Sequence, residues 1–302
     1  MTIYLGIDGG GTKTTCVVAD ETSTLGSATT GGSNITRHGE ARVREALHAA
    51  VKAACAAARV EPSQIESACV GLSGAGRVEV RDVVAGIMRE LVGGRMTVIS
   101  DLETTLQAAF HDGPGVITIA GTGSIAYGRD ARGQTARAGG WGLAISDEGS
   151  AQWIGRTAVS AVLGAKDAGL EPPLLATILK LWQLSSLDEL VRRANASPPP
   201  DFSSLFRPVV SAADAGDPLA RQLLDNAGSE LATLASNVVC RLFAAEDSVP
   251  VAMSGGVFRQ SERVRQVFYN KLIAECPQTR VDANLAEPVK GALELARKAA
   301  GK

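Results

Sequence analysis

Near its start the chain reads IYLGIDGGGTKTTCVVA (residues 3–19), in which three consecutive glycines separate two apolar runs. The runs at residues 3–8 and 14–19 are rich in β-branched residues, which predicts two strands joined as a hairpin. A plain hairpin turn needs one or two glycines, whereas this turn has three, followed by Thr-Lys-Thr. Successive backbone N–H groups that no side chain obstructs form a concavity that attracts anions. The stretch therefore predicts a hairpin whose turn binds phosphate.

Individual side chains around this turn add to the same interpretation. The hydroxyl groups of Thr12 and Thr14 and the cation of Lys13 supply further donors to an anion. Asp8 stands at the end of the first predicted strand. Mg²⁺ keeps several waters and uses few protein carboxylates, so we expect Asp8 to hold this ion, with water between them.

The pattern of strand, glycine turn and strand starts again in the middle of the chain. An apolar run at residues 116–120 precedes Gly121-Thr122-Gly123-Ser124, and a second short run follows at residues 125–128. The repeat predicts two related α/β halves with a cleft between them and a boundary near residues 113–115. Two phosphate-binding hairpins at equivalent points indicate one nucleotide held by both halves.

The rest of the chain alternates strands with helices, which favours sheets covered by helices. Helices are expected where apolar residues recur with a period of 3.6, and strands where short apolar runs precede turns. The predicted helices span residues 40–59, 78–91, 102–110, 150–163, 174–184, 187–194, 218–245, 260–274 and 288–300, and further strands span 67–72, 96–100 and 249–254.

Composition excludes several classes of function. The net charge is -2 and aromatic residues make up 4%, which argues against a nucleic-acid partner. The five cysteines include no C-x-x-C pair, so neither a disulfide framework nor a metal cluster is expected. The first residues lack the pattern of a signal peptide, and the longest run without charge, residues 113–128, is short for a membrane span. We expect a cytoplasmic protein without membrane contact.

Two familiar nucleotide motifs fit only in part. Gly6 and Gly11 have the spacing of a P-loop, but Thr12 stands where lysine is required. Residues 121–126 match the dinucleotide pattern G-x-G-x-x-A, which must open a helix. The residues that follow predict a strand and a turn instead. A bound nicotinamide cofactor is therefore not expected.

Seven short motifs, taken in order, resemble the BadF/BadG/BcrA/BcrD ATPase family of the actin-like ATPase and sugar kinase superfamily. Each motif alone is weak, but together they are specific and cover nearly the whole chain. They lie at residues 8–14, 33–34, 100–101, 121–124, 139–142, 147–151 and 254–257.

This resemblance implies an α/β fold of two actin-like ATPase (ribonuclease H-like) domains with an interdomain cleft. The N-terminal domain would comprise residues 1–114 and 288–302, and the C-terminal domain residues 115–287. The implied activity is an ATP- and Mg²⁺-dependent transfer of phosphate to the 6-hydroxyl of N-acetylglucosamine by a homodimer. Glucosamine is the alternative substrate. A third possibility, an ATPase activator of an acyl-CoA reductase or dehydratase, is disfavoured because the cysteine spacing suits no iron–sulfur cluster.

The resemblance also implies roles for single residues. Asp101 matches the catalytic base. Each has a plainer interpretation: Asp101 and Asp147 could cap the helices that follow them, Asn34 could be a turn residue, and Trp141 could belong to the core. The residues implied to bind the amino sugar are Asn34, Gly140, Trp141 and Asp147. Those implied to bind ATP are Gly10, Gly11, Thr12, Lys13, Thr14, Gly121, Thr122, Gly123, Ser124, Gly255 and Gly256.

Overall fold

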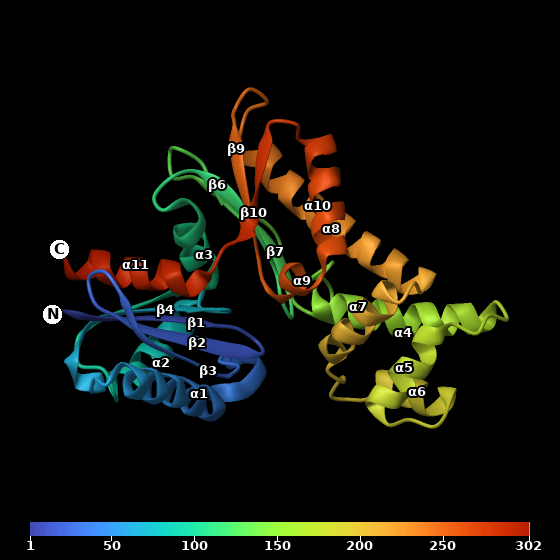
Figure 1. Cartoon of the computed structure of the whole chain (residues 1–302), viewed down its shortest axis with the longest axis horizontal. Coiled ribbons are helices and arrows are strands. Elements are labelled where there is room, and N and C mark those ends of the chain that lie inside the picture. Colours follow the sequence, from blue (N-terminus) through green and yellow to red (C-terminus); the bar gives the residue numbers. More distant parts are fainter. Residues whose placement is uncertain (302) are drawn as a thin grey trace. The chain divides into compact units, whose positions relative to one another are not determined.

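The computed structural model describes residues 1–301 and divides into two compact units. Unit 1 comprises Met1–Gly113 and Ala286–Lys302, and unit 2 comprises Pro114–Leu285. Each unit contains one five-stranded sheet covered by helices, so the predicted α/β fold is confirmed (Figure 1). The predicted domains, 1–114 with 288–302 and 115–287, stay a prediction.

The sheet of unit 1 has the strand order β3-β2-β1-β4-β5. Strand β1 pairs antiparallel with β2, with Gly9 opposite Thr14, which confirms the predicted hairpin. Strand β3 was not predicted, because this edge strand consists mainly of Thr, Ser, Gly and Ala and alternates weakly in burial. The strands are β1 (Ile3–Gly9), β2 (Lys13–Ala19), β3 (Thr24–Gly31), β4 (Ile65–Leu72) and β5 (Arg95–Ser100).

Alternation along β1 assigns its side chains to two different layers. Ile3, Leu5 and Ile7 pack into the core formed with α1 (Ile35–Ala58) and α2 (Val78–Arg89). Tyr4, on the opposite face, packs against α11 (Pro288–Ala300). Asp8 has the same parity as Tyr4, so it lies on the face covered by α11 rather than in the apolar core.

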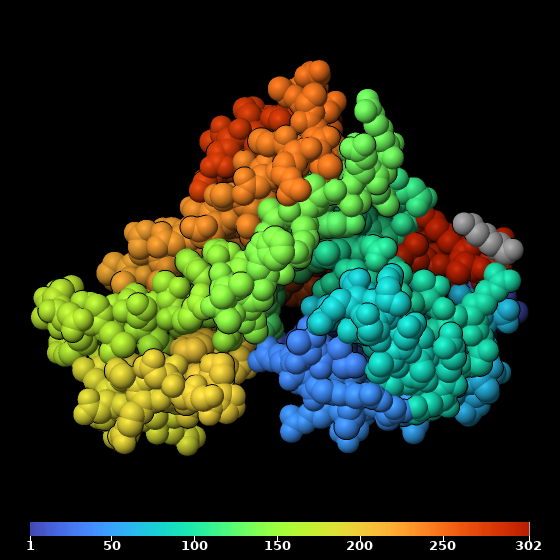
Figure 2. All heavy atoms as spheres, turned by 180° about the vertical axis from the view of Figure 1, so that it is seen from behind, coloured from blue at the N-terminus to red at the C-terminus, as the bar shows by residue number. Residues whose placement is uncertain are grey.

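The C-terminal helix α11 packs closely on unit 1 although it is the last element of the chain (Figures 1 and 2). A Cβ on Gly6 of β1 would lie 2.7 Å from the backbone nitrogen of Leu293. A Cβ on Gly291 would lie 2.0 Å from the carbonyl oxygen of Thr104 in α3 (Asp101–Phe110). Both glycines are therefore required for close approach, and α11 is held against β1 and α3 together.

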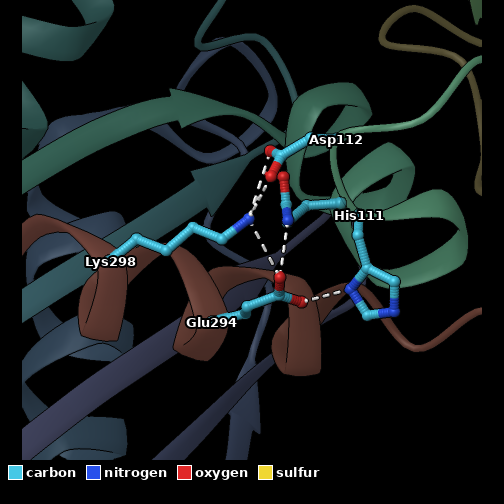
Figure 3. Close-up of polar contacts among 5 residues, drawn as sticks. His111, Asp112, Glu294 and Lys298 are labelled. Atoms are coloured by element: carbon cyan, nitrogen blue, oxygen red, sulfur yellow. Dashed lines mark hydrogen bonds and ion pairs between the residues drawn. The ribbon is translucent and has the colours of Figure 1, made fainter.

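A charged cluster fastens α11 to the end of α3 (Figure 3). Glu294 accepts a hydrogen bond from His111 Nδ1 at 2.9 Å, and its other oxygen lies 3.0 Å from Lys298 Nζ. Lys298 also contacts both carboxylate oxygens of Asp112, at 3.1 and 2.9 Å. His111 and Asp112 directly follow α3, so the cluster joins the last residues of that helix to α11.

The sheet of unit 2 repeats the arrangement of unit 1, with the order β10-β9-β6-β7-β8. Strand β6 pairs antiparallel with β7 and parallel with β9, as β1 does with β2 and β4. The segment after Gly123 is a strand, so the predicted second hairpin is confirmed. The strands are β6 (Gly115–Ala120), β7 (Ser124–Arg129), β8 (Thr135–Gly139), β9 (Val249–Ser254) and β10 (Thr279–Leu285).

The helices of unit 2 form one apolar core with its sheet. Asp217 caps α8 and Pro218 is its first residue, as the sequence predicts. Helix α7 and strands β8 and β10 had not been recognised, because each is short or carries several polar residues. Among the described residues, no helix is long and apolar enough to cross a bilayer. The helices are α4 (Ala151–Asp167), α5 (Pro173–Trp182), α6 (Leu187–Ala194), α7 (Phe206–Asp214), α8 (Pro218–Leu242), α9 (Gly256–Gln260) and α10 (Glu262–Glu275).

Candidate functional site

The first glycine turn, residues 10–13, joins β1 to β2 in unit 1. The Gly10 N–H donates to the carbonyl of Lys13 at 3.0 Å and closes the turn, while the Gly10 carbonyl accepts from Ser33 N–H at 3.0 Å. A Cβ on Gly10 would meet nothing within 4 Å, and Thr12 and Lys13 are exposed. Hydrogen bonds therefore hold the backbone of the turn, while the space beside Gly10 is open, as an anion site requires.

Thr14 occupies a different place from the one that the phosphate interpretation gives it. Its side chain is fully buried, and its hydroxyl lies 2.7 Å from the Gly31 carbonyl and 2.8 Å from Ser33 Oγ. These two partners satisfy the hydrogen bonding of the hydroxyl inside the protein. Thr14 thus holds the first glycine turn in place, whereas Thr12 and Lys13 are exposed.

Two further residues support the first glycine turn and were not singled out from the sequence. His38 Nε2 lies 2.7 Å from the carbonyl oxygen of Gly11. The Ser73 N–H donates to the Gly9 carbonyl at 2.9 Å. No local motif marks either residue, because both reach the turn only through the packing of α1 and the end of β4.

Asn34 is the N-cap of α1. Its Oδ1 accepts from the Arg37 N–H at 3.1 Å, and its Nδ2 donates to Ser73 Oγ at 3.3 Å. The backbone N–H of Asn34 donates to the Gly10 carbonyl at 3.2 Å. Its half-buried side chain therefore lies beside the first glycine turn. Asn34 therefore links the predicted phosphate turn to a helix start, and the cap leaves part of its amide exposed.

Asp101 is the first residue of α3, and Ser100 is the N-cap. Ser100 Oγ accepts from the Leu102 N–H at 3.1 Å, and the Glu103 carboxylate accepts from the Ser100 N–H at 3.0 Å. The capping role that the sequence left open between these residues thus falls to Ser100. Asp101 is half-buried and directly follows β5.

The sheet brings Asp8 and Asp101 to the same edge. Strands β1, β4 and β5 are parallel, so their carboxyl ends meet there. On β4, the residue paired with Asp8 is Gly71, and a Cβ on it would lie 2.5 Å from Thr104 Oγ1. The absence of a side chain on Gly71 lets α3 pack closely, which places its first residue beside the end of β1.

Burial and the neighbouring charge of Asp8 raise the pKa of Asp101 to about 7. The larger cause is burial, since the low-dielectric surroundings disfavour the charged carboxylate. Hydrogen bonds from Ser100 and from the N–H groups of the first turn of α3 act in the opposite direction. A carboxyl group with a pKa near neutrality is suited to accept a proton at physiological pH.

The residues of unit 1 fit a magnesium ion that reaches the protein mainly through water. Among the described residues, no three His, Cys, Asp or Glu side chains gather into a complete metal site. Asp8 and Asp101 instead form a pair of carboxylates close enough to repel one another. Mg²⁺ is held in proteins by one or two carboxylates together with water and substrate phosphates. Asp8 is therefore the group that would hold it.

The second glycine turn, residues 121–123, joins β6 to β7 in unit 2. The Gly121 N–H donates to the carbonyl of Gly123 at 2.9 Å. The carbonyl groups of Gly121 and Thr122 accept from the first N–H groups of α4, at 2.9 and 3.3 Å. Ser124, like Thr14, is buried, and its hydroxyl donates to the Glu148 carbonyl at 2.6 Å. The turn's remaining N–H groups are its candidate donors to a phosphate.

Asp147 lies directly against the second glycine turn. Its side chain is 5% exposed, and a Cβ on Gly123 would lie 2.8 Å from its Oδ2. Burial raises the pKa of Asp147, while the nearby backbone N–H groups of Ser124 and Gly142 act in the opposite direction. The cap of α4 is Ser150, whose Oγ accepts from Trp153 N–H at 3.1 Å. Asp147 is therefore not a helix cap.

Trp141 is exposed, with 64% of its surface accessible, so the interpretation as a core residue is wrong. The Arg137 guanidinium lies 4.0 Å from the centre of its ring. Gly140, directly before it, has φ +69°, and a Cβ there would lie 2.6 Å from the Ile125 side chain. A glycine is required at that position, and it leaves the indole projecting from the segment between β8 and α4.

Gly255 and Gly256 follow β9 beside the end of β6. Gly255 has φ +102°, and a Cβ on it would lie 2.2 Å from the Ala120 carbonyl oxygen. Because β6 and β9 are parallel neighbours, this pair and the second glycine turn share one edge of the sheet. The structure thus gathers Gly255 and Gly256 with residues 121–123 in unit 2, and Asp8, Asn34 and Asp101 with the first glycine turn in unit 1.

A five-stranded sheet that occurs twice, each time with a glycine turn after its first strand, defines the fold class of the actin-like ATPases and ROK-type kinases. A ROK family glucokinase from Streptomyces griseus, solved with glucose and AMPPNP, shares this fold. The two structures superpose with a TM-score of 0.65 at 17% identity, over 98% of this chain and 99% of that one.

Within this class, the chain belongs to the BadF/BadG/BcrA/BcrD ATPase family, which matches residues 5–296. A relative from Clostridium acetobutylicum, named N-acetylmuramic acid/N-acetylglucosamine kinase, is 30% identical over 98% of this chain and 99% of its own length. A solved structure of a candidate N-acetylglucosamine kinase from Chromobacterium violaceum has a TM-score of 0.78 and 27% identity. It covers 98% of this chain and 99% of that one.

Proposed function

We propose that the protein transfers the γ-phosphoryl group of ATP to the 6-hydroxyl of N-acetylglucosamine. The observation that carries the proposal is the carboxyl group of Asp101, whose pKa is about 7, beside Asp8 and at the sheet edge that bears the first glycine turn. Family membership and the names of the relatives support the same activity.

In the proposed reaction, Asp101 accepts the proton of the sugar hydroxyl as its oxygen attacks the γ-phosphorus. A bond forms between that oxygen and phosphorus, the bond from phosphorus to the β-γ bridging oxygen breaks, and ADP leaves. The N–H groups of both glycine turns and the Lys13 cation would stabilise the charge on the phosphates. Mg²⁺ held at Asp8 would neutralise further charge on the phosphate oxygens. Gly255 and Gly256 would lie against the adenosine.

The amino sugar would contact Asn34, Gly140, Trp141 and Asp147. An exposed indole offers a flat apolar face to a sugar ring, and glycines on either side leave room beside it. We propose cytoplasmic activity and a homodimer, the latter to be tested by light scattering.

One observation favours N-acetylmuramic acid as a second substrate. Arg137 stacks on Trp141, and no carboxylate of the described residues lies within ion-pair distance of its guanidinium. An unpaired cation beside a sugar platform suits a substrate that carries a carboxylate. The relative from Clostridium acetobutylicum bears the names of both sugars.

A coupled assay of ADP release tests the proposal. Purified protein with ATP and Mg²⁺ is offered N-acetylglucosamine, N-acetylmuramic acid, glucosamine, N-acetylmannosamine and glucose in turn. Sugar-dependent ADP release and a sugar 6-phosphate product are expected, with N-acetylglucosamine giving the highest kcat/KM. A ranking led by glucosamine would support the alternative kinase. ADP release that no sugar stimulates would overturn the kinase and favour an ATPase activator.

A further inference from the structure

Helices α8 and α10 of unit 2 pack side by side and run in the same direction (Figure 1). Near the start of α10, Arg263 Nε and Nη2 each lie 2.6 Å from a carboxylate oxygen of Asp225 in α8. Further along both helices, Lys271 Nζ lies 3.0 Å from Thr233 Oγ1. The partners are 38 residues apart in both contacts, so the two helices keep one register along their length.

This register brings two thiol groups together where α10 ends. Cys276 directly follows α10, and its S–H donates to Ser236 Oγ of α8 at 3.6 Å. Cys240 follows Ser236 by four residues, so it lies on the same face of α8, one turn further on. The Cα–Cβ bonds of a helix tilt toward its N-terminus, which directs the Cys240 side chain back toward Ser236 and the Cys276 sulfur. The two cysteines are therefore neighbours, although they belong to different helices.

The two thiols differ in their access to solvent. Cys240 is exposed, whereas Cys276 has only 1% of its surface accessible. The backbone of Cys276 is fixed, because its N–H donates to the Leu272 carbonyl at 2.7 Å and its carbonyl accepts from the Thr279 N–H at 3.0 Å. Burial raises the pKa of the Cys276 thiol, and the neighbouring Cys240 raises it further, while the hydrogen bond to Ser236 lowers it. A reagent from solvent can therefore reach Cys240 first, with Cys276 held beside it.

We infer that Cys240 and Cys276 form a site of reversible oxidation, at which glutathione disulfide is reduced and one intramolecular disulfide forms. The Cys240 thiolate attacks one sulfur of glutathione disulfide, which gives a mixed disulfide and releases a first glutathione. The Cys276 sulfur then attacks the Cys240 sulfur of the mixed disulfide, and a second glutathione leaves. Two electrons pass from the protein thiols to glutathione disulfide, and the two thiol protons pass through water to the departing thiolates.

A second pair of neighbouring thiols provides an internal control. Cys16 in β2 and Cys55 in α1 both pack into the apolar core of unit 1, with 0% and 2% of their surfaces accessible. Burial raises the pKa of the Cys16 thiol, and the neighbouring Cys55 raises it further. If access from solvent selects the reactive pair, Cys16 and Cys55 stay reduced under conditions that oxidise Cys240 and Cys276.

The test exposes the native protein to glutathione disulfide, without any other ligand. Remaining thiols are then alkylated in denaturant, and the protein is digested with trypsin without reductant and analysed by mass spectrometry. The parent is expected to yield one disulfide-linked pair of peptides, residues 222–241 and 272–280, with Cys16 and Cys55 recovered as alkylated thiols. Dithiothreitol should return Cys240 and Cys276 to the alkylated set, since thiol–disulfide exchange is reversible.

Cys276→Ser and Cys240→Ser separate the two steps. Cys276→Ser should stop after the first step and keep glutathione on Cys240, whereas Cys240→Ser should leave Cys276 unmodified. The linked peptides are sought in the parent itself, so the inference stays testable if a variant does not fold. A parent in which Cys240 carries only glutathione, links two copies of the chain or does not react would overturn the inference. Oxidation of Cys16 and Cys55 to the same extent would also overturn it. None of these outcomes depends on the proposed kinase activity.

Discussion

The glycine turns of the two units are built alike from beneath. Thr14 and Ser124 occupy matching positions, because each pairs with the last residue of the strand before its turn. Each hydroxyl is buried and donates to a carbonyl on another segment, at 2.7 Å from Gly31 and 2.6 Å from Glu148. The two units therefore support a phosphate-sized turn in the same way.

The units differ in the charged groups around the turns. Unit 1 has Asp8 one residue before the end of β1, and Ile119 holds that place in β6 of unit 2. Asp101 directly follows β5, whereas Ala286 directly follows β10. Lys13 has no counterpart among the residues of the second glycine turn. Under the proposed function, the acid–base chemistry would therefore fall to unit 1, where Asp8 and Asp101 lie.

The largest effect is expected from Asp101→Asn. Removing a positioned base typically lowers turnover by about 10²–10⁴-fold. Helix α3 should remain intact, because Ser100 and not Asp101 is its cap. Turnover is measured with saturating ATP and N-acetylglucosamine at pH 8. Glu103→Gln is the control, since Glu103 is another acid of the same helical turn and is exposed. If both variants lost turnover equally, Asp101 would have no special role.

Substitution of glycine by valine in the two turns is expected to separate binding from folding. At Gly10 the new side chain meets open space in the protein, so ATP affinity should fall by at least about tenfold with little change in melting temperature. At Gly123 it meets the Asp147 carboxylate, so both quantities should fall. Calorimetry and thermal unfolding measure the two effects. Unchanged ATP affinity in a folded Gly10→Val variant would assign the first glycine turn to chain reversal alone.

A smaller effect concerns stability and pH. The pKa of Asp101 is raised to about 7 in the folded protein, from 3.8, so the folded state keeps its proton where the unfolded state has lost it. The contribution of Asp101 to stability is therefore full below pH 3.8 and is lost as pH rises toward 7. Asp101→Asn removes this dependence. In ligand-free protein without Mg²⁺, its melting temperature minus that of the parent should increase from pH 5 to pH 8. A difference that is constant or decreases would contradict the raised pKa.

Much of the fold could be predicted because local patterns and tertiary structure agree. The first hairpin, the helix after Asp217 and the last helix all carry strong local signals: β-branched runs around glycines, an N-cap before proline, and an amphipathic period. Strand β3 carried none, since its small polar residues gain their pairing from β2 rather than from their own propensity.

The sequence could predict which residues belong to the candidate site, but not which contacts these residues make. The inward orientation of Thr14 depends on β3 and Ser33, and the bond from His38 to Gly11 depends on the packing of α1. The contact between Gly123 and the Asp147 carboxylate joins two segments that meet only in the folded unit. Such contacts connect residues that are distant in sequence, so no spacing rule reveals them.

The most direct test is the pH dependence of kcat/KM for N-acetylglucosamine, compared between the parent and Asp101→Asn. A base must be deprotonated to act, so the parent should gain activity as pH rises and level off once Asp101 has lost its proton, at a pH below about 7 because Mg²⁺ at Asp8 offsets the charge that raises the pKa of Asp101 in the ligand-free protein. The variant should show only a low residual activity without this rise. A variant whose kcat/KM stays within about threefold of the parent and rises with the same apparent pKa would contradict the assignment of Asp101 as the base.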